Sequence, residues 1–536
     1  MKQNRPNEYN FNGIKEVLDE QEQYRQYLFT KGYLITENAA IDMAAYPFYS
    51  LWNLTVIENY MFYIHPRQKL YLTKSKDKTY FLIGHAYNPI TMQIREEDIV
   101  ADVNLMEESS GYFAKINELT GVFITGFIEG ENICFVGDAS CMQTAFYGII
   151  NGKLYVSSHT QLLGDICKLK IDTYIEKLIN YRYYHLFGIM LPGDLSPYKE
   201  IKQLMPNHQV CYEKGEIFHQ RFWPLEKLPE CVNDREYRLL IHEAAQLLHN
   251  NIKLIADKWP GNTAISMTGG CDSKTTLSCA NGFYNKFSYF SYVSSKAEQA
   301  DAEAAKEICK KLGVDHKNYY IPDDDSTYPD IEIWRQILRH NTGNIGSQNK
   351  NDVRKRIYFV RNHDFEVEVK SWVSEIVRAY YNKRFIKATF PKKITPRYLT
   401  AMYKFFGMER KLVAETDRIF AEYLNDYFTE KVFNQICWTD LLFWEFRVSS
   451  WNGLIISNEH QLSYDITIPY NNRILLQKML AMPQDKRIAD ICHKDIQRVM
   501  NPQIADMSIA VTNLNHTTRR AKLERIYYEI QTRLPF

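Results

Sequence analysis

The spacing of apolar and polar residues divides the chain into two parts with different predicted secondary structure. In the first part, apolar residues recur at helical spacing over residues 14–45 and then form short runs separated by turns. Paired runs at residues 69–85, 145–157 and 209–222 predict β-hairpins, and Asn151-Gly152 is a strong turn signal in one of them. This part is therefore expected to form antiparallel sheets with helical layers.

The second part alternates between helix and strand. Apolar residues at helical spacing predict a long amphipathic helix over residues 237–255. Strands are predicted at residues 264–267, 287–293 and 316–321, and a helix follows each of the first two. This repeat favours a parallel, doubly wound sheet, in which ligands bind beyond the carboxyl ends of the strands.

One stretch of the second part combines the features of a phosphate-binding loop. A predicted strand runs into Thr268-Gly269-Gly270 and then directly into a helix that begins near Asp272 and Ser273. Glycines allow backbone conformations that a Cβ forbids, and they allow a ligand to approach closely. The free N–H groups and the dipole of a helix N-terminus favour an anion. The stretch predicts a phosphate cradle, and the alternative is an ordinary tight turn before a capped helix.

The pattern Thr-Gly-Gly-x-Asp-Ser resembles the pyrophosphate loop of the ATP pyrophosphatases, which include asparagine synthetase, GMP synthetase and NAD synthetase. The resemblance implies that ATP is cleaved between its α and β phosphates and that Asp272 binds Mg²⁺. The end of the second strand is expected to approach the adenine and ribose. The residues assigned to ATP and pyrophosphate in this region are Ser266, Thr268, Gly269, Gly270, Asp272, Ser273, Ser291 and Val293.

A later loop, within residues 364–381, resembles the second magnesium loop of the asparagine synthetase family. Glu375 keeps the acidic position, but Ser374 stands where the family has Asp, and Arg378 and Ala379 replace its glycines. Serine is a poor magnesium ligand because hard cations prefer carboxylate oxygen. Glu375 is the candidate base or second metal ligand. Arg378 is interpreted as a phosphate or carboxylate ligand, with a structural Arg–Glu pair as the alternative.

Lys494 and Arg498 match the Lys-x-x-x-Arg pattern of asparagine synthetases. The resemblance implies that Lys494 reaches the α-phosphate and stabilises the charge that builds up during adenylation and amide formation. The two side chains share one face of a helix. The alternative to a role in phosphate binding is therefore that they form a solvated basic face. His493 is interpreted as a surface residue. A basic amphipathic helix is predicted at residues 519–536.

Residues 1–225 resemble the glutaminase domain of asparagine synthetase, in the order of strands, Gly137-Asp138 and the hairpin that ends at Ser158. The resemblance implies an Ntn-type antiparallel αββα domain, followed by a synthetase domain over residues 226–536. The family's nucleophile is a cysteine directly after the initiator Met, whereas this chain begins Met1-Lys2. We therefore expect no glutamine hydrolysis. Three further residues are interpreted as buried scaffold: His85, Cys141 and His159.

Composition narrows the range of partners. Lys plus Arg number 65 and Asp plus Glu number 64, so no net field attracts nucleic acid or an anionic membrane. The 10 cysteines form no Cys-x-x-Cys pairs, which disfavours a zinc site or a disulfide framework and suits the cytoplasm. No signal peptide and no membrane-spanning run are recognised. Folds of this kind often pair, so a homodimer is considered.

The resemblance implies an ATP- and Mg²⁺-dependent ligase that adenylates a carboxylate of a small molecule or peptide. An amine from a co-substrate, or from the same substrate, then forms an amide. One alternative is an asparagine synthetase that uses free ammonia. A second is a nucleotide-binding scaffold whose catalysis has degenerated. A third, a pyrophosphatase that modifies tRNA or a base, is disfavoured by the neutral charge and the lack of paired catalytic cysteines.

Overall fold

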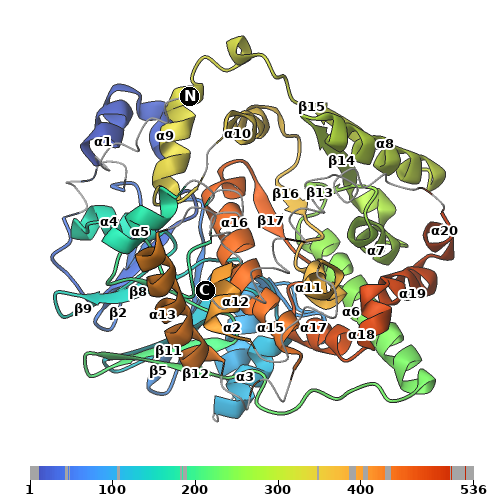
Figure 1. Cartoon of the computed structure of the whole chain (residues 1–536), viewed down its shortest axis with the longest axis horizontal. Helices are drawn as coiled ribbons and strands as arrows, with labels where there is room; N and C mark the ends of the chain where they lie inside the picture. The colour runs from blue at the N-terminus through green and yellow to red at the C-terminus, as the bar shows by residue number, and fades with distance from the viewer. Residues whose placement is uncertain are drawn as a thin grey trace.

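The structure is a computed structural model. It describes residues 11–42, 46, 49–104, 109–181, 184, 190–346, 349–384, 394–401, 409–428, 432, 436–507, 509 and 526. The basic helix expected at residues 519–536 therefore lies, apart from residue 526, outside the described residues. Figure 1 shows the antiparallel strands on the left and the parallel strands β13 to β16 on the upper right.

The first part of the chain forms two six-stranded antiparallel sheets. One sheet has the order β10-β8-β9-β1-β3-β2 and the other has the order β12-β11-β7-β6-β5-β4. The strands of the first sheet are β10 (Lys202–Gln203), β8 (Phe146–Ile150), β9 (Lys153–Ser157), β1 (Tyr33–Thr36), β3 (Tyr60–Ile64) and β2 (Asn53–Ile57). Those of the second are β12 (Glu216–Arg221), β11 (His208–Glu213), β7 (Asn132–Gly137), β6 (Thr120–Glu129), β5 (Lys78–Tyr87) and β4 (Leu70–Ser75).

The two sheets pack face to face through one apolar core. Phe62 of β3 meets Phe81 of β5 edge to face, and Phe135 of β7 meets Tyr147 of β8 in the same way. Helix α2 (Glu96–Asn104) packs on β4 and β5, and α4 (Thr160–Cys167) packs on β9 of the other sheet. The layers are thus αββα, as predicted. Further helices of this part are α1 (Phe11–Glu20), the 3₁₀ helix η1 (Glu22–Tyr27), α3 (Ser109–Glu118) and α5 (Thr173–Ile179).

The predicted hairpins are confirmed. Asn151 and Gly152 have φ values of 52° and 73°, which the turn between β8 and β9 requires, and Lys214-Gly215 turns β11 into β12 in the same way. The helix predicted over residues 14–45 is wrong in its second half. Residues 33–36 form β1, which pairs with both β3 and β9 inside the sheet. A short apolar run buried on both faces cannot be assigned to helix or strand by periodicity alone.

The second part of the chain contains a five-stranded parallel sheet of order β15-β14-β13-β16-β17. All of its strand pairs are parallel. The strands are β13 (Thr263–Ser266), β14 (Ser288–Val293), β15 (Lys317–Tyr320), β16 (Val367–Val369) and β17 (Asp465–Thr467). Strand order runs outward from β13 in both directions, which is the doubly wound arrangement that was predicted.

Helices accompany this sheet on both sides. Asn233 caps the first of them, α6, by accepting from the Glu236 N–H. The helices are α6 (Asp234–Lys258), α7 (Cys271–Cys279), α8 (Lys296–Lys311), α9 (Ile331–Asn341), α10 (Lys350–Asn362), α11 (Tyr380–Arg384), α12 (Pro396–Ala401), α13 (Arg410–Tyr427), α15 (Trp438–Leu442), α16 (Leu454–Asn458), α17 (Arg473–Leu480), α18 (Gln484–Ile488), α19 (Ile491–Met500) and α20 (Pro502–Ala505). Shorter helices include η4 (Tyr284–Lys286), η5 (Asp325–Thr327), η6 (Ser374–Arg378), the π-helix η8 (Phe443–Gly453) and η9 (His460–Leu462).

Buried polar contacts join the two parts of the chain. The Asn471 side chain donates to the Asp138 carboxylate at 2.8 Å, and Arg221 donates to both oxygens of Glu445 at 2.6 and 2.7 Å. Glu445 is 1% exposed and Arg221 is 11% exposed. The predicted boundary at residues 225 and 226 lies between β12 and α6 and stays a prediction, because this interface ties the two parts together.

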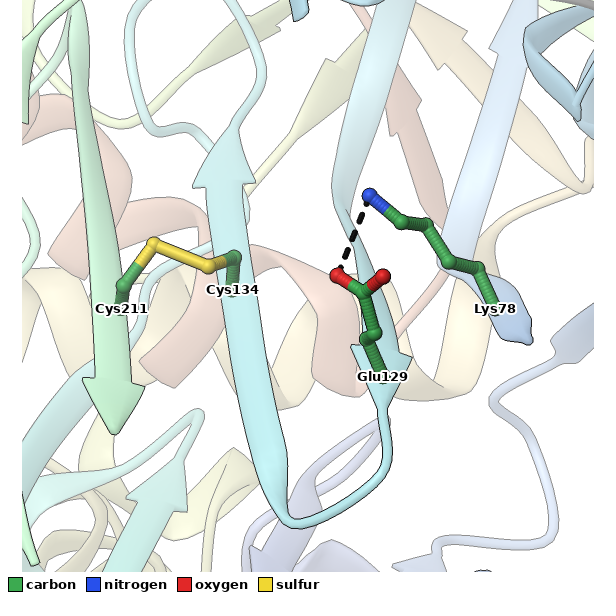
Figure 2. Close-up of a disulfide and its surroundings, with 4 residues drawn as sticks. All are labelled: Lys78, Glu129, Cys134 and Cys211. Carbon is green, nitrogen blue, oxygen red and sulfur yellow. Dashed lines mark ion pairs between the residues drawn. A yellow bond between two sulfur atoms is a disulfide. The ribbon is translucent and has the colours of Figure 1, made fainter. Parts of the chain in front are cut away.

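The cysteine prediction needs a correction. Cys134 of β7 and Cys211 of β11 are directly opposite each other in the sheet and form a disulfide across 77 residues of sequence (Figure 2). The other 8 cysteines are free. Spacing along the chain could not reveal this pair because strand register brings the two residues together. No helix among the described residues has the length and apolar content needed to cross a membrane.

Candidate functional site

The candidate site lies where the winding of the parallel sheet reverses, between β13 and β16. The chain leaves the carboxyl end of β13 into residues 267–270 and α7, and it leaves the carboxyl end of β16 into residues 370–373 and η6. Adjacent parallel strands place these two loops side by side, and ligands of doubly wound sheets bind at this point. The two loops and the helices that follow them, α7 and η6, contain most of the residues that the resemblance assigned.

The first loop leads into a helix whose start has no side-chain cap. The Thr268 Oγ1 and Ser273 Oγ atoms lie 3.0 Å apart, and the Gly270 N–H donates to Thr268 Oγ1 at 3.1 Å. Gly270 is the N-cap of α7 and offers no side chain to its first-turn N–H groups. Backbone N–H groups at a helix start favour an anion as their partner.

Of the two reasons predicted for these glycines, a special backbone conformation and close approach, the structure does not bear out the first. Gly270 has φ −67° and ψ 162°, values that any residue adopts. Gly269 does not have a positive φ either. A Cβ added to Gly270 would lie 3.1 Å from Thr268 Oγ1. The glycines are thus needed for close approach to the backbone rather than for a left-handed conformation.

The second loop contacts the first through Ser374. Its hydroxyl donates to Asp272 Oδ1, so position 374 faces this aspartate. The loop is strained, because Val373 has φ 73° and Ala379 has φ 50°. A β-branched residue in the left-handed region is a genuine outlier, and such strain concentrates at functional sites.

Arg378 links the cradle to the start of α19. Its Nη1 donates to Asp272 Oδ2, and its Nε and Nη2 donate to the Asp490 carboxylate at 2.8 and 3.0 Å. Lys383 donates to the same Asp490 carboxylate. Although burial opposes it, hydrogen bonding to Arg378 and Lys383 holds the pKa of Asp490 at about 2. Arg378 therefore makes a structural ion pair, but with two aspartates rather than with Glu375.

Glu375 carries an unusual carboxyl group. Its Oε2 atom is enclosed and has no hydrogen-bond partner among the described residues. Burial, and then the negative charge of Asp272, raise the pKa of Glu375 to about 7. A carboxyl group with this pKa exchanges protons near neutral pH, which is the property required of a general base. The geometry therefore suits Glu375 better to proton transfer than to holding a metal.

His493 is not a surface residue, and that interpretation was wrong. It is 1% exposed, and its Nε2 lies 3.2 Å from Ser374 Oγ and 3.7 Å from Asp272 Oδ1. Burial lowers the pKa of His493 to about 4, so the ring is neutral at pH 7. The face of α19 that meets α7 consists of His493 and Gln497, whose amide donates to Thr275 Oγ1 at 2.9 Å.

Lys494 and Arg498 occupy the next stripe of α19. Both are exposed, and Arg498 pairs with Asp495 at 2.6 Å. Their proposed contact with phosphate stays a prediction. Besides Arg378, the structure places a second cation, Lys383, beside the site through its bond to Asp490, and the Lys383 side chain is 26% exposed.

The remaining predicted residues have their hydroxyl groups occupied inside the sheet. Ser266 donates to the Val369 carbonyl at 3.3 Å, and Ser291 donates to the Met267 carbonyl at 2.6 Å. Ser291 is buried, and Val293 is half-buried at the end of β14. These residues position the strands that lead to the site, and a direct contact with adenine or ribose stays a prediction.

The donor set does not suit Mg²⁺ as the side chains stand. Both oxygens of Asp272 already accept hydrogen bonds, one from Arg378 and one from Ser374. A cation at Asp272 would lie beside the guanidinium, and like unit charges about 4 Å apart repel by about 4 kcal/mol at an effective dielectric constant of about 20. Ser374 supplies no carboxylate, and Glu375 is half protonated near pH 7. We therefore derive no step through a metal ion.

Sequence reasoning missed three residues of the site: Lys383, Asp490 and, in its role, His493. Asp490 has φ 60°, a left-handed conformation that its short polar side chain tolerates. The only available signal was its position just before the helix that carries Lys494. Its partnership with Arg378 spans 112 residues of sequence, which no local pattern encodes.

Two other features do not belong to this site. A cavity of about 630 Å³ lies at the amino ends of the parallel strands, among residues such as Tyr284, His316 and Asp364, away from both loops. Among the described residues, the one grouping of three potential metal ligands is Cys134, Cys211 and Glu213, and its two sulfurs are already bonded to each other.

Comparisons with known proteins leave the activity open. No protein-family model matches the chain, and no curated protein matches it. One similar solved structure is described as the allosteric regulatory enzyme of purine biosynthesis. The match has 9% identity and a TM-score of 0.23, and covers 57% of this chain and 62% of that chain, less than two thirds of its length.

A second similar structure is glutamine phosphoribosylpyrophosphate amidotransferase from B. subtilis complexed with ADP and GMP. It is 9% identical with a TM-score of 0.21, and the match covers 69% of this chain and 74% of that chain. Likenesses with such low scores carry no argument about function. The strand orders and registers define the fold.

Proposed function

We propose that the protein is an ATP-dependent ligase that activates a carboxylate as an acyl-adenylate and transfers the acyl group to an amine. One observation carries the proposal. The uncapped N-terminus of α7 and the strained loop bearing Glu375 and Arg378 meet at the carboxyl edge of the sheet, where its winding reverses.

In the proposed first step, a carboxylate oxygen of the substrate attacks the α-phosphorus of ATP. The bond between the α-phosphorus and the bridging oxygen breaks, and pyrophosphate leaves with the electron pair. The N–H groups at the start of α7 and the hydroxyls of Thr268 and Ser273 hold the departing pyrophosphate. Arg378 and Lys383 supply positive charge next to it.

In the proposed second step, the amine attacks the carbonyl carbon of the acyl-adenylate. The amide bond forms, AMP leaves, and the proton of the amine passes to the Glu375 carboxylate. Much of the rate would come from holding the amine against the adenylate and excluding water. Lys494 stays a candidate for stabilising the oxyanion, and asparagine formation from ammonia is one special case of the reaction.

A second candidate function is a nucleotide-binding scaffold without catalysis. The ion pair between Arg378 and Asp272 favours it, because it neutralises the carboxylate that the resemblance assigns to catalysis. Both candidates bind ATP, and only the ligase releases pyrophosphate.

The test is to incubate the full chain with ATP and a panel of carboxylic acids and amines, and to quantify AMP and pyrophosphate. Release of both that depends on the acid supports the ligase. Binding of ATP without either product, over the whole panel, supports the scaffold. Absence of ATP binding in calorimetry rejects both. Glutamine is included in the panel. Its hydrolysis above background would contradict the expectation that the first domain does not hydrolyse glutamine.

A further inference from the structure

The Asp272 carboxylate is saturated by groups of the chain itself. Arg378 Nη1 donates to Oδ2, and the Ser374 hydroxyl donates to Oδ1. The Asp272 side chain is 19% exposed and that of Arg378 is 21% exposed, so both are largely buried but still accessible to solvent. A charged hydrogen bond in such a half-buried place is stronger than one in water.

The same guanidinium is held in place from its other side. Its Nε and Nη2 both donate to Asp490, whose carboxylate also accepts from Lys383. Asp490 in turn is fixed at the start of α19, which packs on α7. Arg378 is therefore pre-organised between two aspartates.

The formal charges of this group balance without any metal ion. Asp272 and Asp490 contribute two negative charges, and Arg378 and Lys383 contribute two positive charges. A site built to hold a divalent cation presents uncompensated carboxylates instead. Position 374, which faces Asp272, contributes a hydroxyl group and no further charge.

We infer that the Arg378 guanidinium takes the place of the divalent cation at Asp272, so that the cradle binds a nucleoside triphosphate without Mg²⁺. The inference rests on the proposed function, because it assumes that the cradle receives a triphosphate. Three of the five N–H groups of Arg378 donate to the two aspartates, which leaves one on Nη1 and one on Nη2 for phosphate oxygens. The N–H groups at the start of α7 supply further donors.

The first experiment measures ATP binding to the full chain by calorimetry, once with EDTA and once with excess Mg²⁺. The expected dissociation constants agree within about threefold. A weakening of about tenfold or more in EDTA would overturn the inference while leaving the proposed function intact. No binding in either condition would overturn both.

The second experiment compares Arg378→Ala with Arg418→Ala, each checked for folding by its thermal transition. Arg418 lies on α13 and pairs with the exposed Glu415 and Glu422, away from the site. Arg378→Ala is expected to weaken ATP binding in EDTA by about 10- to 100-fold, the loss expected for a charge-assisted contact. Arg418→Ala is expected to change nothing.

The third experiment restores the carboxylate with the double variant Ser374→Asp and Arg378→Ala. Mn²⁺ is titrated into the double variant and into the unaltered protein, first without ATP and then with ATP. Bound Mn²⁺ is followed by electron paramagnetic resonance. The double variant should gain a Mn²⁺ site that ATP tightens, and the unaltered protein should show none that depends on Asp272. A tight Mn²⁺ site in the unaltered protein that Asp272→Ala removes would refute the inference, whatever the ligase activity.

Discussion

His493 Nε2 lies 3.7 Å from Asp272 Oδ1, on the buried face of α19. The ring is neutral because burial lowers the pKa of His493 to about 4. A neutral imidazole beside the carboxylate positions it without adding a charge, so Arg378 remains the cation that neutralises Asp272. Asp272 is thus positioned by residues of two helices that are distant in sequence, Arg378 of η6 and His493 of α19.

Replacing Glu375 by Gln should remove the base of the acyl-transfer step. In the unaltered protein, amide formation should rise with pH through about 7, the pKa of this carboxyl group, because the deprotonated form accepts the proton. The variant should lose this rise with pH and should form amide about 100-fold more slowly. It should still release pyrophosphate. Rates of amide and pyrophosphate formation from pH 5 to pH 9 check this. A variant that retains the rise with pH would contradict the role.

The same substitution has a consequence for stability. The folded pKa of Glu375 lies above its ordinary value of 4.5, so the folded protein loses stability as pH rises from about 4.5 to about 7. Glu375→Gln removes this loss, by up to about 3 kcal/mol at pH 8 and by little at pH 4. Urea unfolding at the two pH values measures the difference. A difference that does not change with pH would show that the carboxyl group titrates normally.

Two serines of α7 provide a matched pair for the cradle. Ser273 bonds to Thr268 at the open start of the helix, whereas Ser278 donates to the Lys274 carbonyl within it. Ser273→Ala is expected to weaken ATP binding by about tenfold, the loss of one hydrogen bond to a charged group. Ser278→Ala should leave ATP binding unchanged. Calorimetry on both variants decides, and equal effects would place the phosphates elsewhere.

Lys494 and Lys383 compete for the role of the catalytic lysine. The resemblance favours Lys494, which is exposed on α19, and the structure places Lys383 on Asp490 beside the cradle. We expect Lys383→Ala to lower pyrophosphate release by about 10- to 100-fold, the loss of one charged contact. If Lys494 acts in the transition state, Lys494→Ala lowers kcat and leaves ATP binding unaltered. A Lys494→Ala variant with full kcat would assign it to the solvated face of the helix.

The interface between the two parts of the chain depends on a buried ion pair. Removing one partner leaves the other charged and buried, so Arg221→Ala should destabilise the protein by about 3–5 kcal/mol. The exposed pair of Arg418 with Glu415 serves as the control, and its loss should cost less than about 1 kcal/mol. Urea unfolding of the two variants measures both. Similar small losses would show that the interface is solvated.

The disulfide predicts a count of thiols. Under denaturing, non-reducing conditions, alkylation and mass spectrometry should find 8 modified cysteines, and reduction should add Cys134 and Cys211. Closing a loop of 77 residues stabilises a protein by about 4 kcal/mol in the chain-entropy description, so Cys134→Ser should lower the free energy of unfolding by up to that amount. Ten reactive thiols without reductant would contradict the bond.

The cradle could be recognised from sequence because all of its parts are local. Thr268, Gly269, Gly270 and Ser273 lie within one strand–turn–helix segment, and the order of the neighbouring strands follows from the repeat of helix and strand. The hairpin at Asn151-Gly152 is local in the same sense, since two residues determine the turn.

The partners of these residues could not be recognised in this way. Asp272 meets Ser374 across 102 residues and Arg378 across 106, and Cys134 meets Cys211 across 77. The apolar run at β1 illustrates the same limit, because its burial between two strands decides its conformation.

The amino-acid sequence by itself determined the two kinds of sheet, the strand–turn–helix segment at the start of α7 and the identity of the charged groups. Only the tertiary structure decided how those charges are paired, that Glu375 is enclosed next to Asp272, and that His493 is buried. The physical reason is that strand order and helix packing set distances between loops, and electrostatic interactions depend on distance and burial rather than on position in the chain.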